Sequence, residues 1–193
     1  MISRRAALAA CVLSLILLPA CNSNYDDSAS PVWLTVSSVE PSSDPFGDVY
    51  DSTLGSFMPD TVDLTLAANF ANQNTPPTSS PYTTVQVTHY RVTFERTDDG
   101  VEVPAGFQQG LTVSVEAGGS QVTVDDVTIV RADQKLQEPL YYLTPFSYGF
   151  EPSTGYTTIA CNCIIDIYGQ TLAGETVTAR AVIGINFADY ANE

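Results

Sequence analysis

Alternation of apolar and polar side chains is the feature that most narrows the folds open to this chain. Val62, Leu64, Leu66 and Ala68 occupy every second position of one run. In an extended strand these side chains point to the same face, so the pattern is typical of a β-strand with one buried side. The same pattern recurs along the chain, for example from Leu111 to Val115, and no stretch has a convincing helical period. The alternation therefore predicts an all-β protein.

Turn residues divide the alternation into about seven strands. The predicted strands span residues 32–39, 61–70, 83–96, 111–115, 122–129, 159–167 and 177–187. Asp98-Asp99-Gly100 has the composition of a hairpin turn. Strands with one apolar face each, over roughly 160 residues, fit a single antiparallel two-sheet sandwich. We predict this domain at residues 32–190, with an acidic loop at 40–59 and an aromatic-rich passage at 135–156.

The inward-facing set of side chains changes phase at two places. In the strand predicted at 83–96, Val85 and Val87 are followed by Tyr90, so one residue is skipped. In a regular strand, skipping one residue would turn every later side chain to the other face. A β-bulge near Thr88-His89 is therefore needed to keep the later apolar side chains on the buried face. Asp125-Asp126 marks a second change of phase by the same reasoning.

Two segments resemble immunoglobulin and fibronectin type III domains of exported bacterial proteins. They are the hairpin-like YRVTFERTDDG at Tyr90–Gly100 and the terminal INFADY at Ile185–Tyr190. The resemblance, together with the strand order, implies an immunoglobulin-like sandwich. The cysteine pair that bridges the sheets of immunoglobulin domains, with its buried tryptophan, has no counterpart, and Trp33 lies in the first strand instead.

The first 21 residues have the build of a bacterial export signal. Arg4 and Arg5 precede an apolar run from Ala6 to Leu18, and Leu18-Pro19-Ala20-Cys21 follows. A membrane-spanning helix needs about 20 apolar residues, and this run is shorter. A short membrane span and a plain secretory signal are the alternatives. The ending resembles the lipobox of bacterial lipoproteins, which implies that residues 1–20 are removed and that Cys21 carries acyl chains such as palmitate.

The same resemblance implies a location. The residue after the cysteine is Asn22, not the aspartate that acts as a retention signal in lipoproteins of enterobacterial type. In such lipoproteins this implies sorting to the outer membrane. We expect residues 21–31 to be the lipidated cysteine and a flexible tether, with the domain on the periplasmic or the cell-surface face.

The charge of the chain excludes some partners. Removal of residues 1–20 leaves five basic and 22 acidic residues, a net charge near −17. Such a surface repels nucleic acid and anionic headgroups, whereas cations and basic proteins stay compatible with it. We therefore expect no nucleic acid among the partners, and contact with the membrane through the N-terminal lipid alone.

Few residues could support catalysis. His89 is the only histidine, and the nucleophile elbow, the zinc-protease helix motif and the phosphate-binding glycine loop are missing. A hydrolase would have to use His89 as its base. We expect no enzymatic activity and no cofactor.

Cys161 and Cys163 are the two thiols left after the signal and the lipidated cysteine. They fall on one face of a predicted strand, about 6.5 Å apart at Cα, which is near the upper limit for a relaxed disulfide. Three interpretations stay open: buried apolar thiols, a strained or intermolecular disulfide, and a soft-metal site with His89. The first is the simplest.

Two further groups of residues are candidates for binding. Asp44, Asp48 and Asp51 share one loop and are weak candidates for calcium, since aspartate is also a common turn residue. The aromatic passage is the best candidate for a recognition surface, because tyrosine combines contact area with a polar tip; its alternative role is to cover one end of the core. Its residues are Tyr141, Tyr142, Phe146, Tyr148, Phe150 and Tyr156.

Together these features predict a lipid-anchored interaction or structural protein of the cell envelope, with other envelope proteins as partners. It would serve as an accessory subunit of a larger assembly. A calcium-dependent adhesin or ligand-binding module is the alternative, and a hydrolase that uses His89 is a more distant one.

Overall fold

The computed structural model describes residues 30–71 and 81–190. Within them lie seven strands and three short 3-10 helices. The strands are β1 (Val32–Pro41), β2 (Asp60–Phe70), β3 (Thr84–Arg96), β4 (Phe107–Glu116), β5 (Val122–Val130), β6 (Ile159–Thr171) and β7 (Thr176–Phe187). The 3-10 helices are η1 (Pro81–Thr83), η2 (Gln134–Leu136) and η3 (Leu140–Leu143). The predicted signal peptide at 1–20 and Cys21 lie outside the described residues.

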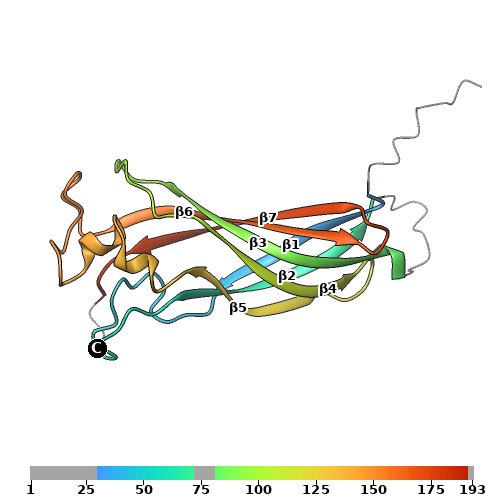
Figure 1. Ribbon diagram of the computed structural model, residues 1–193, viewed down its shortest axis with the longest axis horizontal. Coiled ribbons are helices and arrows are strands. Elements are labelled where there is room, and N and C mark those ends of the chain that lie inside the picture. The colour runs from blue at the N-terminus through green and yellow to red at the C-terminus, as the bar shows by residue number, and fades with distance from the viewer. Residues whose placement is uncertain (1–29, 72–80, 191–193) are drawn as a thin grey trace, which may run out of the picture.

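The strands form two antiparallel sheets packed face to face. One sheet has the order β1-β2-β5 and the other the order β4-β3-β6-β7. This arrangement confirms the predicted all-β, two-sheet sandwich of about seven strands. The strands run along the long axis of the molecule, and the described chain begins at the right-hand end of Figure 1. No helix in the described ranges combines the length and the apolar character needed to cross a membrane.

The alternating residues face each other between the sheets and make the core. Val62, Leu64 and Leu66 of β2 are fully buried, as are Ile165 and Ile167 of β6. Burial of each such side chain contributes about 1.5–3 kcal/mol relative to its exposure. Polar residues at the intervening positions face outward, which is why a period of two was sufficient to predict the two faces.

Both predicted bulges are present. Along β3 and β6, Val87 pairs with Gly169 and His89 with Tyr168, which leaves Thr88 as the extra residue. In β5, Asp125 and Asp126 together stand opposite Asp63, and Asp126 adopts a φ of 54°. Aspartate tolerates this left-handed conformation better than most residues, and the Asp126 N–H donates a hydrogen bond of 3.0 Å to Asp63 Oδ1.

The chain bends at the predicted turn residues Asp98-Asp99-Gly100, where Asp98 Oδ1 accepts a hydrogen bond from the N–H of Gly100 at 3.0 Å. β3 and β4 do pair as a hairpin, but residues 97–106 connect them as a longer loop. The Asp98 carboxylate accepts hydrogen bonds from Arg96 and from the N–H of Ala160, at the start of β6. These contacts hold residue 98 against β6.

Candidate functional site

Three long connections meet at one end of the sandwich. They are residues 42–59 between β1 and β2, residues 97–106 between β3 and β4, and residues 131–158 between β5 and β6. We call this end the loop end. It lies at the left of Figure 1, opposite the end at which the described chain begins. The antiparallel register places them together, because the end of β5 pairs with the start of β2 (Val130 with Asp60) and the start of β6 pairs with the end of β3 (Cys161 with Arg96).

Exposed apolar side chains are concentrated at the loop end. Of the 13 large hydrophobic residues exposed in the described chain, nine belong to the three connections. We call this set the loop-end surface: Leu54, Met58, Val101, Val103, Leu136, Phe146, Tyr148, Phe150 and Tyr156. The largest apolar patches of monomeric proteins are often functional, so this surface is a candidate for binding.

The six aromatic residues predicted as a recognition surface contribute four of these residues, and the other two are half-buried. Phe146, Tyr148, Phe150 and Tyr156 are exposed, whereas Tyr141 and Tyr142 are half-buried. The rings also contact one another: Tyr148 lies 5.8 Å from Tyr142 and 5.9 Å from Phe150 between ring centroids. Leu140 and Leu143 of η3 join the core cluster. The passage therefore covers the core and also presents aromatic side chains outward.

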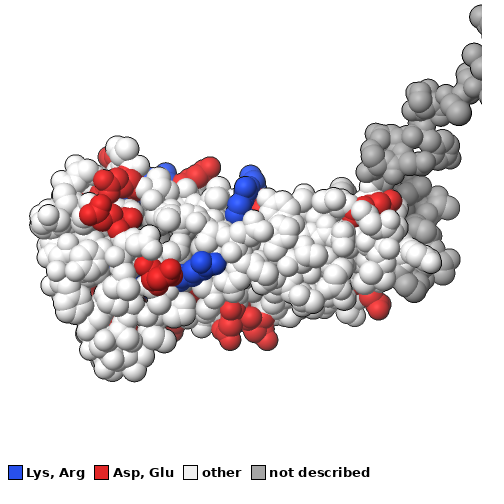
Figure 2. Space-filling view, viewed as in Figure 1, with Lys and Arg blue, Asp and Glu red and all other residues white. Residues whose placement is uncertain are grey.

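The charge around the loop-end surface is acidic. Its connections carry exposed acidic residues, namely Asp44, Asp99, Glu102, Asp133 and Glu138. Figure 2 shows several acidic patches on this end of the molecule, and others along its length. Three basic residues lie in or beside these connections. Arg131 is half-buried, with its guanidinium over the Phe107 ring, whereas the side chains of Arg96 and Lys135 are almost fully buried. The positive charges of Arg96 and Lys135 are therefore withdrawn from the surface.

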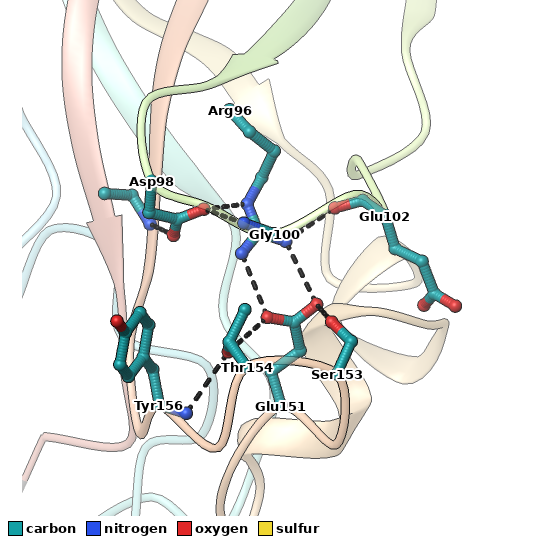
Figure 3. Close-up of polar contacts among 9 residues, drawn as sticks. Arg96, Asp98, Gly100, Glu102, Glu151, Ser153, Thr154 and Tyr156 are labelled. Carbon is teal, nitrogen blue, oxygen red and sulfur yellow. Dashed lines mark hydrogen bonds and ion pairs between the residues drawn. The ribbon is translucent and has the colours of Figure 1, made fainter.

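Arg96 is the centre of a buried hydrogen-bonded network that joins two of the connections (Figure 3). Its Nε donates to Asp98 Oδ1 at 2.6 Å, and Nη2 and Nη1 donate to the two oxygens of Glu151 at 3.0 and 3.3 Å. Nη1 also donates to the Glu102 carbonyl oxygen. Such two-pronged pairing fixes both the distance and the plane of the two groups.

The carboxylates of this network are held in their charged form. The hydrogen bond from Arg96 lowers the pKa of Glu151, helped by the hydroxyls of Ser153 and Thr154. Burial alone would raise the pKa of Asp98, but hydrogen bonds from Arg96 and from the N–H groups of Ala160 and Gly100 outweigh it and lower that pKa. With every partner satisfied, the network holds the aromatic passage against β3 and β6.

A second buried charge cluster lies under the first connection. Lys135 Nζ is 2.9 Å from Asp60 Oδ2 and donates to the backbone oxygen of Asp48. Asp60 Oδ1 accepts from the N–H of Gly47 at 2.9 Å. The Asp48 carboxylate accepts through Oδ1 from the N–H of Tyr190. Asp60 Oδ2 thus has the Lys135 ammonium as its partner, whereas Oδ2 of Asp48 has no hydrogen bond within the described part of the chain.

The three aspartates predicted as weak calcium candidates are near this cluster but do not converge. They line a cavity of about 290 Å³ together with Asp60 and Lys135. Asp51 Oδ1 accepts from the N–H groups of Thr53 and Leu54, as in an ordinary turn. Across residues 30–71 and 81–190, no three acidic, cysteine or histidine side chains are grouped closely enough to hold a metal ion. The cation closest to the buried carboxylates is the ammonium of Lys135.

His89 lies on the outer face of the larger sheet. Its Nδ1 is 2.9 Å from the Thr88 hydroxyl, and its ring stacks on Tyr168 at 4.7 Å. Cys161 and Cys163 are free thiols on the inner face. The sheet therefore separates the histidine from both thiols, and the soft-metal site considered from the sequence is not assembled. Burial raises the pKa of Cys161 to about 11 and that of Cys163 to about 12.

Sequence reasoning did not single out Arg96, Glu151, Asp60 or Lys135. One signal was available: Lys135 is the only lysine of the chain. A buried lysine is nearly always paired, so a lone lysine that precedes an apolar leucine in a strongly acidic protein is a candidate for a buried ion pair.

Comparisons of the chain with protein-family models, with curated proteins and with solved structures gave no match.

Proposed function

We propose that this protein is a lipid-anchored interaction component of the bacterial outer membrane. In this proposal Cys21 holds the chain on the lipid leaflet, and the loop-end surface binds another envelope protein. One observation carries the proposal: the exposed apolar residues gather at the end of the sandwich opposite the start of the described chain. An N-terminal anchor would leave that end directed away from the membrane.

The sandwich between the two ends would act as a spacer. β6 alone has 13 residues, which corresponds to about 40 Å at the rise of an antiparallel strand. β7 pairs with β6 from Ile159 to Gln170, along nearly this whole length, so the loop end would be held at a constant distance from the tether.

The composition of the loop-end surface indicates the chemistry of the partner. Aromatic residues supply much of the binding energy of protein interfaces, and Phe146 and Tyr148 are exposed here. The three connections also carry exposed acidic residues, whereas Arg96 and Lys135 are withdrawn into buried pairs. A partner that presents apolar side chains next to lysine or arginine would fit this surface.

Site-specific photo-crosslinking would test the surface. A photoreactive amino acid in place of Tyr148, which is 62% exposed, is expected to capture an envelope protein in cells. The matched control is Tyr82, which is 69% exposed and lies at the opposite end. Equal capture by the two positions, or capture by Tyr82 alone, would contradict the proposal.

The anchor is tested separately. Cys21→Ser is expected to release the protein from the membrane fraction, because no acyl chain can then be attached. Retention of this variant in the membrane fraction would exclude lipidation as the means of attachment, without bearing on the loop-end surface.

A further inference from the structure

The only lysine of the chain is buried against a carboxylate. The side chain of Lys135 is 2% exposed and that of Asp60 is 1% exposed, with Nζ 2.9 Å from Oδ2. Taking two such charges out of water is costly, and the attraction between them compensates only when their remaining polar atoms are well paired. Here Asp60 Oδ2 has the Lys135 ammonium as its partner, whereas Oδ2 of Asp48, which lines the same cavity, has no hydrogen bond within the described residues. The buried pair therefore lies beside a second carboxyl group that is not fully paired.

The surroundings of the Asp60 carboxyl group are suited to acyl chemistry. The N–H of Gly47 donates to Oδ1 at 2.9 Å, so it can stabilise negative charge that develops on that oxygen. Asp48, which is 5% exposed, has its own unpaired Oδ2. Burial raises the pKa of Asp60 against the opposing effect of Lys135, and the charge of Asp48 adds to the rise. A raised pKa favours the protonated carboxyl group, which is the form that an amine can attack.

We propose that Lys135 and Asp60 join through an intramolecular amide bond between Nζ and Cγ. The bond would connect the first residue of β2 to η2 in the third connection. This inference rests on the buried cluster alone and is independent of the proposed function.

The reaction is a condensation that needs no oxidant or other reagent. Transfer of one proton from the Lys135 ammonium to Asp60 Oδ2 gives a neutral amine and a neutral carboxyl group. The amine lone pair then forms the Nζ–Cγ bond, and the C–Oδ2 bond breaks as that oxygen leaves with its proton. The departing oxygen takes a second proton from the nitrogen, so one amide and one water molecule are formed and the charge is balanced.

Two neighbours would assist these steps. The Asp48 carboxylate would carry the proton from the nitrogen to the departing oxygen, as a general base and then a general acid. The Gly47 N–H would stabilise the oxyanion on Oδ1. Asp48, Asp60 and Lys135 all line the cavity of about 290 Å³, which gives the water molecule a route out of the site.

The lone lysine makes the test simple. Trypsin cleaves after Arg131 and after a free Lys135, which releases the tetrapeptide of residues 132–135. If the amide has formed, trypsin cannot cleave after Lys135. Denatured full-length protein is then expected to yield a branched product that contains Asp60 and Lys135 and is lighter by one water molecule than its separate parts. Quantitative release of the free tetrapeptide from the purified protein would overturn the proposal.

Variants identify the groups involved. Asp60→Ala keeps the trypsin site intact and is expected to release the tetrapeptide completely, whether or not this variant folds. Asp48→Asn keeps the size of the side chain and is expected to fold but to cross-link much more slowly, measured as the fraction of free tetrapeptide over time after refolding. Cross-linking by Asp48→Asn at the rate of the unaltered protein would remove Asp48 from the mechanism. A branched product from Asp60→Ala would show that a different carboxyl group reacts and would overturn the assignment.

Discussion

The loop end contains two buried charge clusters that differ in how completely their polar atoms are paired. In the Arg96 cluster the guanidinium meets Asp98, Glu151 and the Glu102 carbonyl oxygen, and both carboxylates have further donors. In the Lys135 cluster Asp60 Oδ2 contacts the Lys135 ammonium, but Asp48 Oδ2 has no hydrogen bond among the described residues. A fully paired buried network makes a fold rigid, whereas an unpaired buried polar atom is costly. The first cluster thus has the properties of a structural clasp, and the second is the one for which we propose the Lys135–Asp60 amide.

Removal of Arg96 is expected to have the largest effect on stability. Arg96→Ala would leave Glu151 and Asp98 buried without their main partner, and loss of one member of a buried pair costs about 3–5 kcal/mol. Urea unfolding would measure this loss. Arg96→Lys is the matched control: it keeps the charge but not the two-pronged geometry, so a smaller loss is expected. Equal losses would mean that the geometry of the guanidinium is unimportant.

Thiol labelling would show where the fold opens when each cluster is broken. Cys161 pairs with Arg96 in the β3–β6 register and Cys163 pairs with Phe94. Because burial raises the pKa of both thiols to about 11 and about 12, little labelling is expected at pH about 8 in the folded protein. In Arg96→Ala, Cys161 is expected to label about tenfold or more faster, ahead of Cys163. Uniform acceleration would indicate global unfolding and no local role for the clasp.

Acid is expected to weaken the Arg96 cluster. The pKa values of Asp98 and Glu151 are lower in the folded protein than in the unfolded chain. These two carboxylates therefore contribute fully to stability at any pH above the ordinary carboxyl pKa of about 4. Their contribution is lost as the pH falls through the lower pKa values that they have in the folded protein. Urea midpoints should be flat near neutral pH and fall below about pH 4. The fall should be smaller in Arg96→Ala, and an equal fall in both proteins would place the acid sensitivity elsewhere.

Gly100 packs against the guanidinium of Arg96. A Cβ at this position would lie 1.8 Å from Arg96 Nη2, so the loop or the clasp would have to move. Gly100→Ala is expected to reduce the free energy of unfolding by about 1–3 kcal/mol. Gly110→Ala is the control, since no atom lies within 4 Å of its added Cβ; its effect is expected to be about 1 kcal/mol or less. A neutral Gly100→Ala would show that the clasp adapts easily.

A surface ion pair should have the smallest effect. Arg91 contacts Asp166 at 3.1 Å on the outer face, where its side chain is 49% exposed. Exposed pairs contribute about 0–1 kcal/mol, and Arg180 also holds Asp166. Arg91→Ala is therefore expected to leave the urea midpoint almost unchanged. A loss comparable to that of Arg96→Ala would show that burial is not what distinguishes the clasp.

The fold was largely predictable because its signal is local. The period of two in β2 and β6 identified the buried faces, and the skipped residue after Val87 located the bulge at Thr88. Such patterns depend only on neighbours along one strand. The contact of Asp98 with the N–H of Ala160 could not be predicted in this way, because Ala160 lies 62 residues away in the sequence.

The candidate site was only partly predictable. The aromatic passage was visible as composition, and the sequence correctly left open both of its roles, as a cover and as an exposed surface. Arg96 and Glu151 are 55 residues apart, and Lys135 is 87 residues from Asp48, with loops between them that follow no period. The sequence by itself determined the strands, their inward faces and their bulges, because alternation is a property of the local backbone. Only the tertiary structure decided which buried charges meet, since that depends on how three separate loops close over one end of the sandwich.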